Sequence, residues 1–174
     1  MVMDELVEYR QSLLGCMQST LDELKSMVAR IPADQIIQPV EAAGWSAHQI
    51  TAHLRDKQAQ AYLPRLRKIL LDQSPCLDSF SGEDWMRVKY RADETLTIIL
   101  VEYEALWKEE MSLFAVLSEA DWSRSGRHPV WGMRTLQWWL EQSLVHARAH
   151  IRQLQVYVQK LERQGEQATA GQVC

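Results

Sequence analysis

Residues 136–161 read LQWWLEQSLVHARAHIRQLQVYVQKL, and this stretch decides the fold that the sequence predicts. Its apolar or small residues recur at alternating spacings of four and three, which is the period of one helix face. The inward positions are Leu136, Leu140, Ser143, Ala147, His150, Leu154, Tyr157 and Leu161. The pattern predicts a long amphipathic helix that begins after Thr135 and ends at Gly165, because glycine is common just beyond helix ends.

Three further segments carry the same periodicity. Apolar residues from Leu6 to Val28 form one stripe that ends at Ile31-Pro32, because proline restricts the residue before it. Leu96 to Phe114 form another stripe, for which Asp93 is the expected N-cap.

The second helix is predicted from its start signal. Ser46 followed three residues later by Gln49 fits a capping box, in which each side chain pairs with a free backbone N–H of the other residue. Pro64 lies deep in the same segment and removes one helical hydrogen bond, so we expect a kink or break there.

The connections complete the predicted architecture. Residues 75–91 are expected to be a long connection with some helical turns, and residues 119–134 a loop. Only 7 Gly and 5 Pro are present, which favours long helices with few turns. The sequence therefore predicts an all-α fold, a four-helix bundle with a long middle crossover over residues 1–164, and a disordered tail over residues 165–174.

Composition excludes several classes of function. The net charge is -4 and no long run of Lys or Arg occurs, so the chain lacks the basic surface of a nucleic-acid-binding protein. No stretch is apolar enough for a membrane span, and the acidic N-terminus is unlike a signal peptide. The three cysteines are odd in number and far apart, which favours a reducing compartment, and we expect a cytoplasmic protein. A catalytic role for Cys16 or Cys76 is the weaker interpretation beside that of a small buried residue.

Three histidines form the candidate site. His146 and His150 are four residues apart, about 40° around a helix axis, so both imidazoles can reach one metal ion. His53 lies on the apolar face of the second helix and completes the group if that helix neighbours the fourth. Three nitrogen ligands with an open position are typical of catalytic zinc sites. The competing interpretations are an exposed pair that arises by chance and a buried histidine that bonds only a carbonyl or carboxylate.

Four other polar residues have two interpretations each. Asp56 either orients a ligand imidazole or pairs with a surface Arg or Lys, and Gln153 either donates to a metal-bound water or lies at a polar rim. His48 points away from His53 on an ideal helix, so we expect it at the surface or in a dimer face. His128 either closes over the site or, as we favour, makes a local hydrogen bond within its loop.

The chain resembles the DinB-like superfamily of bacterial metal-binding four-helix bundles, over roughly residues 4–160. The residues that carry the resemblance are Gly44-Trp45-Ser46, Ala52-His53-Leu54, His128-Pro129-Val130-Trp131-Gly132, Thr135-Leu136 and His146-x3-His150-x2-Gln153. The resemblance implies a divalent metal, zinc or nickel, held by His53, His146 and His150. It also implies a homodimer, and relatives include transferases and isomerases that use low-molecular-weight thiols such as bacillithiol or mycothiol.

The leading hypothesis is a metal-dependent enzyme whose open metal position activates water or a low-molecular-weight thiol, as a hydrolase or transferase acting on a small-molecule substrate. No catalytic residue beyond the metal ligands is assigned, and no other cofactor is expected. The alternative is a metal-binding or stress-response interaction module without catalysis. A third interpretation is a plain helical dimer in which the histidines are incidental.

Overall fold

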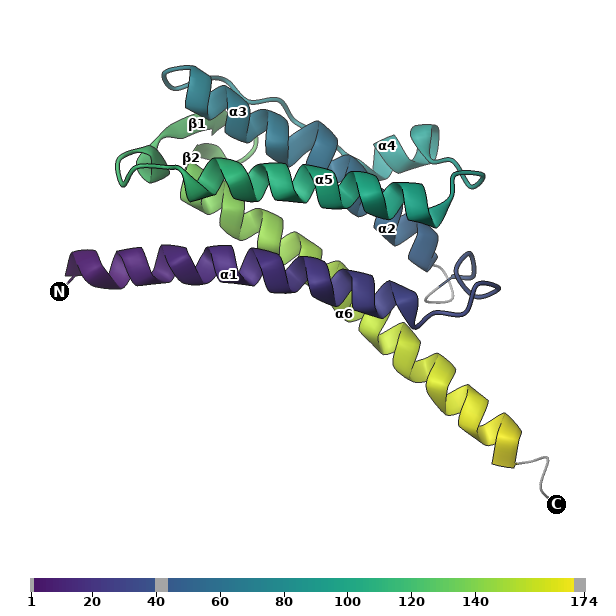
Figure 1. Ribbon diagram of the computed structural model, residues 1–174. Coiled ribbons are helices and arrows are strands. Elements are labelled where there is room, and N and C mark those ends of the chain that lie inside the picture. The colour runs from purple at the N-terminus through teal and green to yellow at the C-terminus, as the bar shows by residue number, and fades with distance from the viewer. Residues whose placement is uncertain (1, 40–43, 171–174) are drawn as a thin grey trace.

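The computed structural model describes residues 2–39 and 44–170. The elements, in chain order, are α1 (Val2–Ala29), α2 (Ala47–Lys57), the π-helical turn η1 (Gln58–Tyr62), α3 (Leu63–Leu71), α4 (Gly82–Lys89), α5 (Leu96–Ala115), the 3₁₀ turn η2 (Asp121–Ser123), β1 (Ser125–His128), β2 (Gly132–Thr135) and α6 (Leu136–Ala170). Figure 1 shows the long helices packed side by side, with the C-terminal part of α6 extending beyond the others.

The predicted all-α four-helix bundle is confirmed. Its four members are α1, the continuous helix formed by α2, η1 and α3, then α5, and α6. Helix α1 packs against α5 and α6, and α2 packs against the same two helices, so the two pairs enclose one core. The predicted middle crossover joins Leu71 to Leu96 and carries α4, which packs on α2 (Figure 1).

The core is aromatic and aliphatic. Its largest fully buried side chains come from all four members of the bundle, and include Met17, Leu66, Trp107 and Trp139. Burying such side chains contributes roughly 1.5–3 kcal/mol each, so this core supplies the main stabilisation of the bundle. Within the described residues, no helix combines the length and the apolar character that crossing a membrane would require.

The capping box predicted at the start of α2 is present. The Ser46 hydroxyl accepts the Gln49 backbone N–H at 3.1 Å, and the Gln49 side-chain oxygen accepts the Ser46 N–H at 2.9 Å. These two bonds satisfy donors that a helix start leaves free, and thereby set the first residue of α2.

Pro64 distorts its helix without ending it. The five residues before α3 form the π-helical turn η1, in which the backbone N–H of Leu63 reaches the carbonyl of Gln58. Proline has no N–H to donate to the carbonyl four residues earlier, and a π-helical turn is a common way to absorb such an interruption. The predicted irregularity is thus confirmed, and α2 and α3 stay in line.

Two local predictions of secondary structure are wrong. Helix α5 begins after Thr95, whose hydroxyl accepts the N–H of Ile98, whereas the expected cap Asp93 pairs with Arg91 at 2.9 Å. The expected loop 119–134 contains an antiparallel hairpin, with Gly126 opposite Arg134. Gly132 has a φ of 69°, a conformation that glycine adopts without strain, and this allows the tight return into β2.

The predicted end of the fourth helix at Gly165 is also wrong, because α6 continues to Ala170. A glycine inside a helix costs only about 1 kcal/mol relative to alanine, so it does not by itself end one. Residues 165–170 belong to α6, residues 171–174 lie outside the described residues, and the disordered tail over residues 165–174 stays a prediction. The boundary between residues 164 and 165 stays a prediction.

Candidate metal centre

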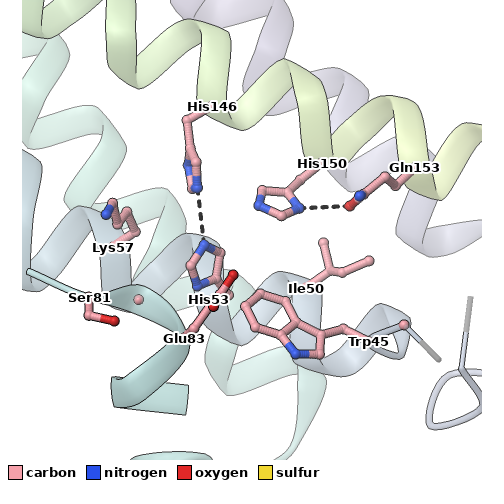
Figure 2. Close-up of a pocket in the computed structure, with 11 residues that line it drawn as sticks. Trp45, Ile50, His53, Lys57, Ser81, Glu83, His146, His150 and Gln153 are labelled. Atoms are coloured by element: carbon pink, nitrogen blue, oxygen red, sulfur yellow. Dashed lines mark hydrogen bonds between the residues drawn. The ribbon is translucent and has the colours of Figure 1, made fainter. Parts of the chain in front are cut away.

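His53, His146 and His150 lie together. Each offers a ring nitrogen, and the three nitrogens lie within 4.8 Å of one another. The Nε2 atoms of His53 and His146 are 3.0 Å apart, and Figure 2 shows the two rings pointing toward each other from α2 and α6. The expected proximity of the second and fourth helices is confirmed, since α2 and α6 are in contact.

The spacing and chemistry of these nitrogens suit a divalent metal. Two nitrogens bound to one tetrahedral zinc ion at 2.0–2.1 Å are about 3.3 Å apart, close to the His53–His146 distance. Burial, reinforced by the charges of His150 and Lys57, lowers the pKa of His53 to about 3. Burial, reinforced by the two neighbouring imidazoles, lowers the pKa of His146 to about 2. Both imidazoles are therefore neutral at neutral pH, which is the form that binds a metal.

Gln153 orients the third imidazole. The Nδ1 atom of His150 lies 2.9 Å from Oε1 of Gln153, three residues further along α6. A carbonyl oxygen only accepts hydrogen bonds, so Nδ1 carries the proton and Nε2 keeps its lone pair. Figure 2 shows that other ring nitrogen on the side of His53 and His146. Gln153 thus lies at the rim of the pocket, and its side-chain oxygen holds the His150 imidazole in one orientation.

Gly82 is a residue of the site that the sequence did not reveal. It is the first residue of α4, and a Cβ atom placed on it would lie 2.4 Å from Cε1 and 3.1 Å from Nδ1 of His53. Any side chain at position 82 would displace the His53 ring. The Ser81 cap, whose hydroxyl accepts the Asp84 N–H, indicates a helix start at this point, but nothing local shows that it lies on α2.

The three histidines open into a pocket of about 540 Å³. Trp45 and Ile50 form an apolar wall, and the indole of Trp45 stacks on His150 with an angle of 14° between the ring planes. Lys57 and Glu83 are the charged residues of the lining (Figure 2). The described part of the chain brings no fourth His, Cys, Asp or Glu into the three-histidine group, so one side of it is left to a ligand from the pocket.

His48 is not at the surface, so that prediction is wrong. It is buried between α2 and the start of α5, where Nδ1 accepts from the Tyr90 hydroxyl and Nε2–H donates to the Glu94 carbonyl, both at 2.8 Å. Helical geometry correctly pointed it away from His53, but the crossover covers that face. His48 takes no part in the three-histidine group.

His128 and Asp56 also lie outside the group. The Nδ1 atom of His128 accepts the backbone N–H of Val130 at 3.2 Å, which is the local hydrogen bond that we favoured for this residue. Asp56 accepts from Arg55 at 2.8 Å and from the indole N–H of Trp85 at 3.0 Å. Asp56 therefore forms an ion pair with Arg55 within α2, and its bond from Trp85 joins α2 to α4. It has no hydrogen bond to an imidazole among the described residues.

Several named proteins are similar to this chain. A protein of Oceanobacillus iheyensis is 29% identical over 106 residues, covering 61% of this chain and 60% of its own length. A protein of Bacillus licheniformis is 22% identical over 149 residues, covering 81% of this chain and 84% of its own. Both are named, provisionally, as metal-dependent hydrolases. The first alignment thus spans less than two thirds of that relative.

Solved structures show the same fold. YfiT from Bacillus subtilis, described as "a probable metal-dependent hydrolase with an unusual four-helix bundle topology", superposes with a TM-score of 0.81 at 20% identity over 89% of each chain. The four-helix bundle protein TT2238 superposes with a TM-score of 0.58 at 15% identity, over 84% of this chain and 98% of its own. A model of the DinB superfamily matches residues 17–154, including all three histidines of the group. The chain belongs to the DinB superfamily.

Proposed function

We propose that His53, His146 and His150 hold a divalent metal, Zn²⁺ or Ni²⁺, and that the protein is a metal-dependent hydrolase acting on a small molecule. The observation that carries this proposal is the geometry of the group. Three imidazole nitrogens from two helices converge within 4.8 Å and open on a pocket of about 540 Å³. Buried imidazoles need partners, and a metal ion satisfies all three at once.

A metal held by three nitrogens with an open position would lower the pKa of a bound water or thiol and so supply a nucleophile near neutral pH. The chain provides the surroundings. Gln153 holds the proton of His150 on Nδ1, and Gly82 leaves room for the His53 ring. Trp45 and Ile50 line the pocket with apolar surface, which excludes water from part of it.

The open pocket favours an enzyme over a closed, structural metal site or a non-catalytic module. A structural zinc site has four protein ligands, whereas the described residues bring only three together. The relatives named as metal-dependent hydrolases favour water as the activated group. Transfer of a low-molecular-weight thiol would use the same open position, so we keep it as the second reaction to test.

Metal content tests the proposal directly. Protein purified without a polyhistidine tag is expected to hold one Zn²⁺ or Ni²⁺ per chain, measured by elemental analysis, and His150→Ala is expected to lose it. His128→Ala is the matched control, since His128 lies outside the group. Sub-stoichiometric metal that His150→Ala leaves unchanged would overturn the proposal.

The loaded protein is then assayed with ester and amide substrates in water, and with bacillithiol, mycothiol and glutathione as acceptor thiols. Hydrolysis that follows metal occupancy supports the first reaction, and thiol consumption supports the second. Sedimentation of the same sample measures whether the chain forms the homodimer that the family resemblance led us to expect.

A further inference from the structure

Lys57 is a cation without a counter-charge in the wall of the pocket. It lies one helical turn after His53 on α2 and lines the same cavity (Figure 2). Its ammonium donates to the Phe80 carbonyl at 3.4 Å and lies 5.2 Å from the centre of the Phe80 ring. Among the described residues, no carboxylate lies within ion-pair distance of this ammonium.

Arg55, two residues earlier on the same helix, shows the contrast. Its guanidinium pairs with Asp56 at 2.8 Å, Glu94 at 2.7 Å and Glu102 at 2.8 Å. Both cations are partly withdrawn from water, yet only Arg55 has its charge neutralised. A partly buried cation without an anion is unfavourable, and burial lowers the pKa of Lys57 accordingly. An anion that enters the pocket would relieve this cost.

Two other features of the pocket favour one negative charge rather than several. Ser81 and Gly82, at the N-terminal end of α4, border the cavity, and helix N-termini attract anions. Glu83 also lines the cavity, at its exposed side, and repels a second negative charge. A single ammonium lacks the paired donors with which an arginine fork grips a phosphate dianion.

We infer that Lys57 is a substrate-binding residue that pairs with a carboxylate of the substrate while the reacting group of the same molecule lies at the three histidines. This inference rests on the proposed function, because it assigns the substrate class of that site. The substrate is thus a small carboxylic acid whose reactive group lies a few bonds from the carboxylate. When the substrate binds, the Lys57 ammonium would exchange its weak contact with the Phe80 carbonyl for a charged hydrogen bond to the substrate carboxylate.

The first test uses protein loaded with Co²⁺, whose visible spectrum reports thiol binding. The probes are mercaptoacetate, 3-mercaptopropionate and 4-mercaptobutyrate, each compared with its neutral amide. The best acid is expected to bind roughly tenfold more tightly than its amide, since a hydrogen bond between charged groups contributes about that factor. Lys57→Met should abolish the preference, Lys57→Arg should keep part of it, and Glu83→Gln should keep or increase it. Equal acid-to-amide ratios in the wild type and Lys57→Met would overturn the inference.

The second test needs no metal. In metal-free protein, the NMR signal of the Lys57 ε-methylene, assigned by its loss in Lys57→Met, is followed during titration with acetate and with acetamide. A saturable shift with acetate alone supports the inference, and identical responses to the two probes contradict it. If elemental analysis shows no metal but acetate still shifts the Lys57 signal, the proposed function fails and the anion site stands.

Discussion

The five histidines form two groups that are both withdrawn from water and differ in their partners. His48 and His128 each have hydrogen-bonding partners from the backbone or a tyrosine, so their polar atoms are satisfied within the chain. His53, His146 and His150 face one another, and only His150 has a non-histidine hydrogen-bond partner among the described residues. Burial of a histidine therefore indicates little about function, whereas the absence of a protein partner is informative.

This difference gives opposite expectations for the two groups. A satisfied histidine stabilises the fold, and its removal leaves a buried donor or acceptor without a partner. A histidine held for an external ligand contributes little to the stability of the empty protein. Measuring metal affinity and the free energy of unfolding in the same variants separates the two roles.

The largest effect is expected for His53→Ala. If the three histidines hold a metal as proposed, loss of one of them should weaken metal binding by more than about 100-fold, because changes to residues beyond the ligands already cost 10- to 100-fold. The stability of the metal-free protein should change little. His48→Ala should do the reverse, lowering the free energy of unfolding by about 1–3 kcal/mol with unchanged metal affinity. Competition with a metal indicator measures the metal affinity, and urea unfolding measures the stability. Loss of metal in His48→Ala would contradict the assignment of the two histidine groups to different roles.

Gly82→Ala should damage the three-histidine group without removing a ligand. The added methyl would lie 2.4 Å from Cε1 of His53, so the ring must turn away from the other two. We expect metal affinity to fall by roughly 10- to 100-fold, as for other changes that misorient a ligand. Gly15→Ala is the control, because nothing lies within 4 Å of its added methyl. Equal metal affinities in the two variants would show that the His53 ring accommodates the added methyl group without leaving the other two histidines.

Glu110 extends the comparison to a carboxyl group whose partners are incomplete. It is fully buried on α5, and its Oε2 accepts from Gln58 and from Ser143, the latter at 3.3 Å. Among the described residues, Oε1 of Glu110 has no hydrogen-bond partner. Burial raises the pKa of Glu110 from 4.5 to about 8. The folded protein thus keeps a proton that the unfolded chain releases above pH 4.5.

Stability should therefore fall as the pH rises from about 4.5 to about 8, and this contribution should be constant above that range. Glu110→Gln has no carboxyl proton to lose, so the free energy of unfolding of this variant, relative to that of the wild type, should be about 3–4 kcal/mol higher at pH 8 than at pH 5. Urea unfolding at the two pH values measures the difference. A wild type and variant with parallel pH profiles would mean that Glu110 is ionised in the folded protein.

The smallest effect is expected for Gln153→Leu. It removes the acceptor that holds the His150 proton on Nδ1, and we expect metal affinity to fall about tenfold. Gln153→Glu supplies a stronger acceptor and should restore or increase the affinity. Gln155→Leu, at an exposed position two residues further along α6, is the control. If all three variants bind metal equally, Gln153 is an ordinary rim residue.

The candidate site was predictable in part because some of its geometry is local. His146 and His150 belong to one helix, and a spacing of four residues places them on one face whatever surrounds them. The cap at Ser46 likewise depends on residues three apart, and it was correctly identified. The error at Asp93 arose because Thr95, two residues later, is an equally good cap, and the position of α5 in the bundle selects between them.

Local helical geometry could not predict the roles of Gly82, Lys57 and His48. Their roles depend on the crossover, which brings α4 over His53 and residues 90 and 94 over His48. Neither the path of this crossover nor the missing carboxylate beside Lys57 leaves a periodic pattern in the sequence. Such contacts arise between residues far apart in the chain, where many arrangements are compatible with the same helices.

By itself, the sequence determined the four amphipathic helices, the cap of α2, the irregularity at Pro64 and the paired imidazoles of α6. All of these follow from interactions within one or two helical turns. Only the tertiary structure decided that His53 completes the group, that a glycine contacts its ring and that Lys57 lines the pocket with no carboxylate of the described residues paired to it. The reason is physical: helical periodicity specifies which face of a helix is apolar, whereas the packing of distant segments specifies what that face meets.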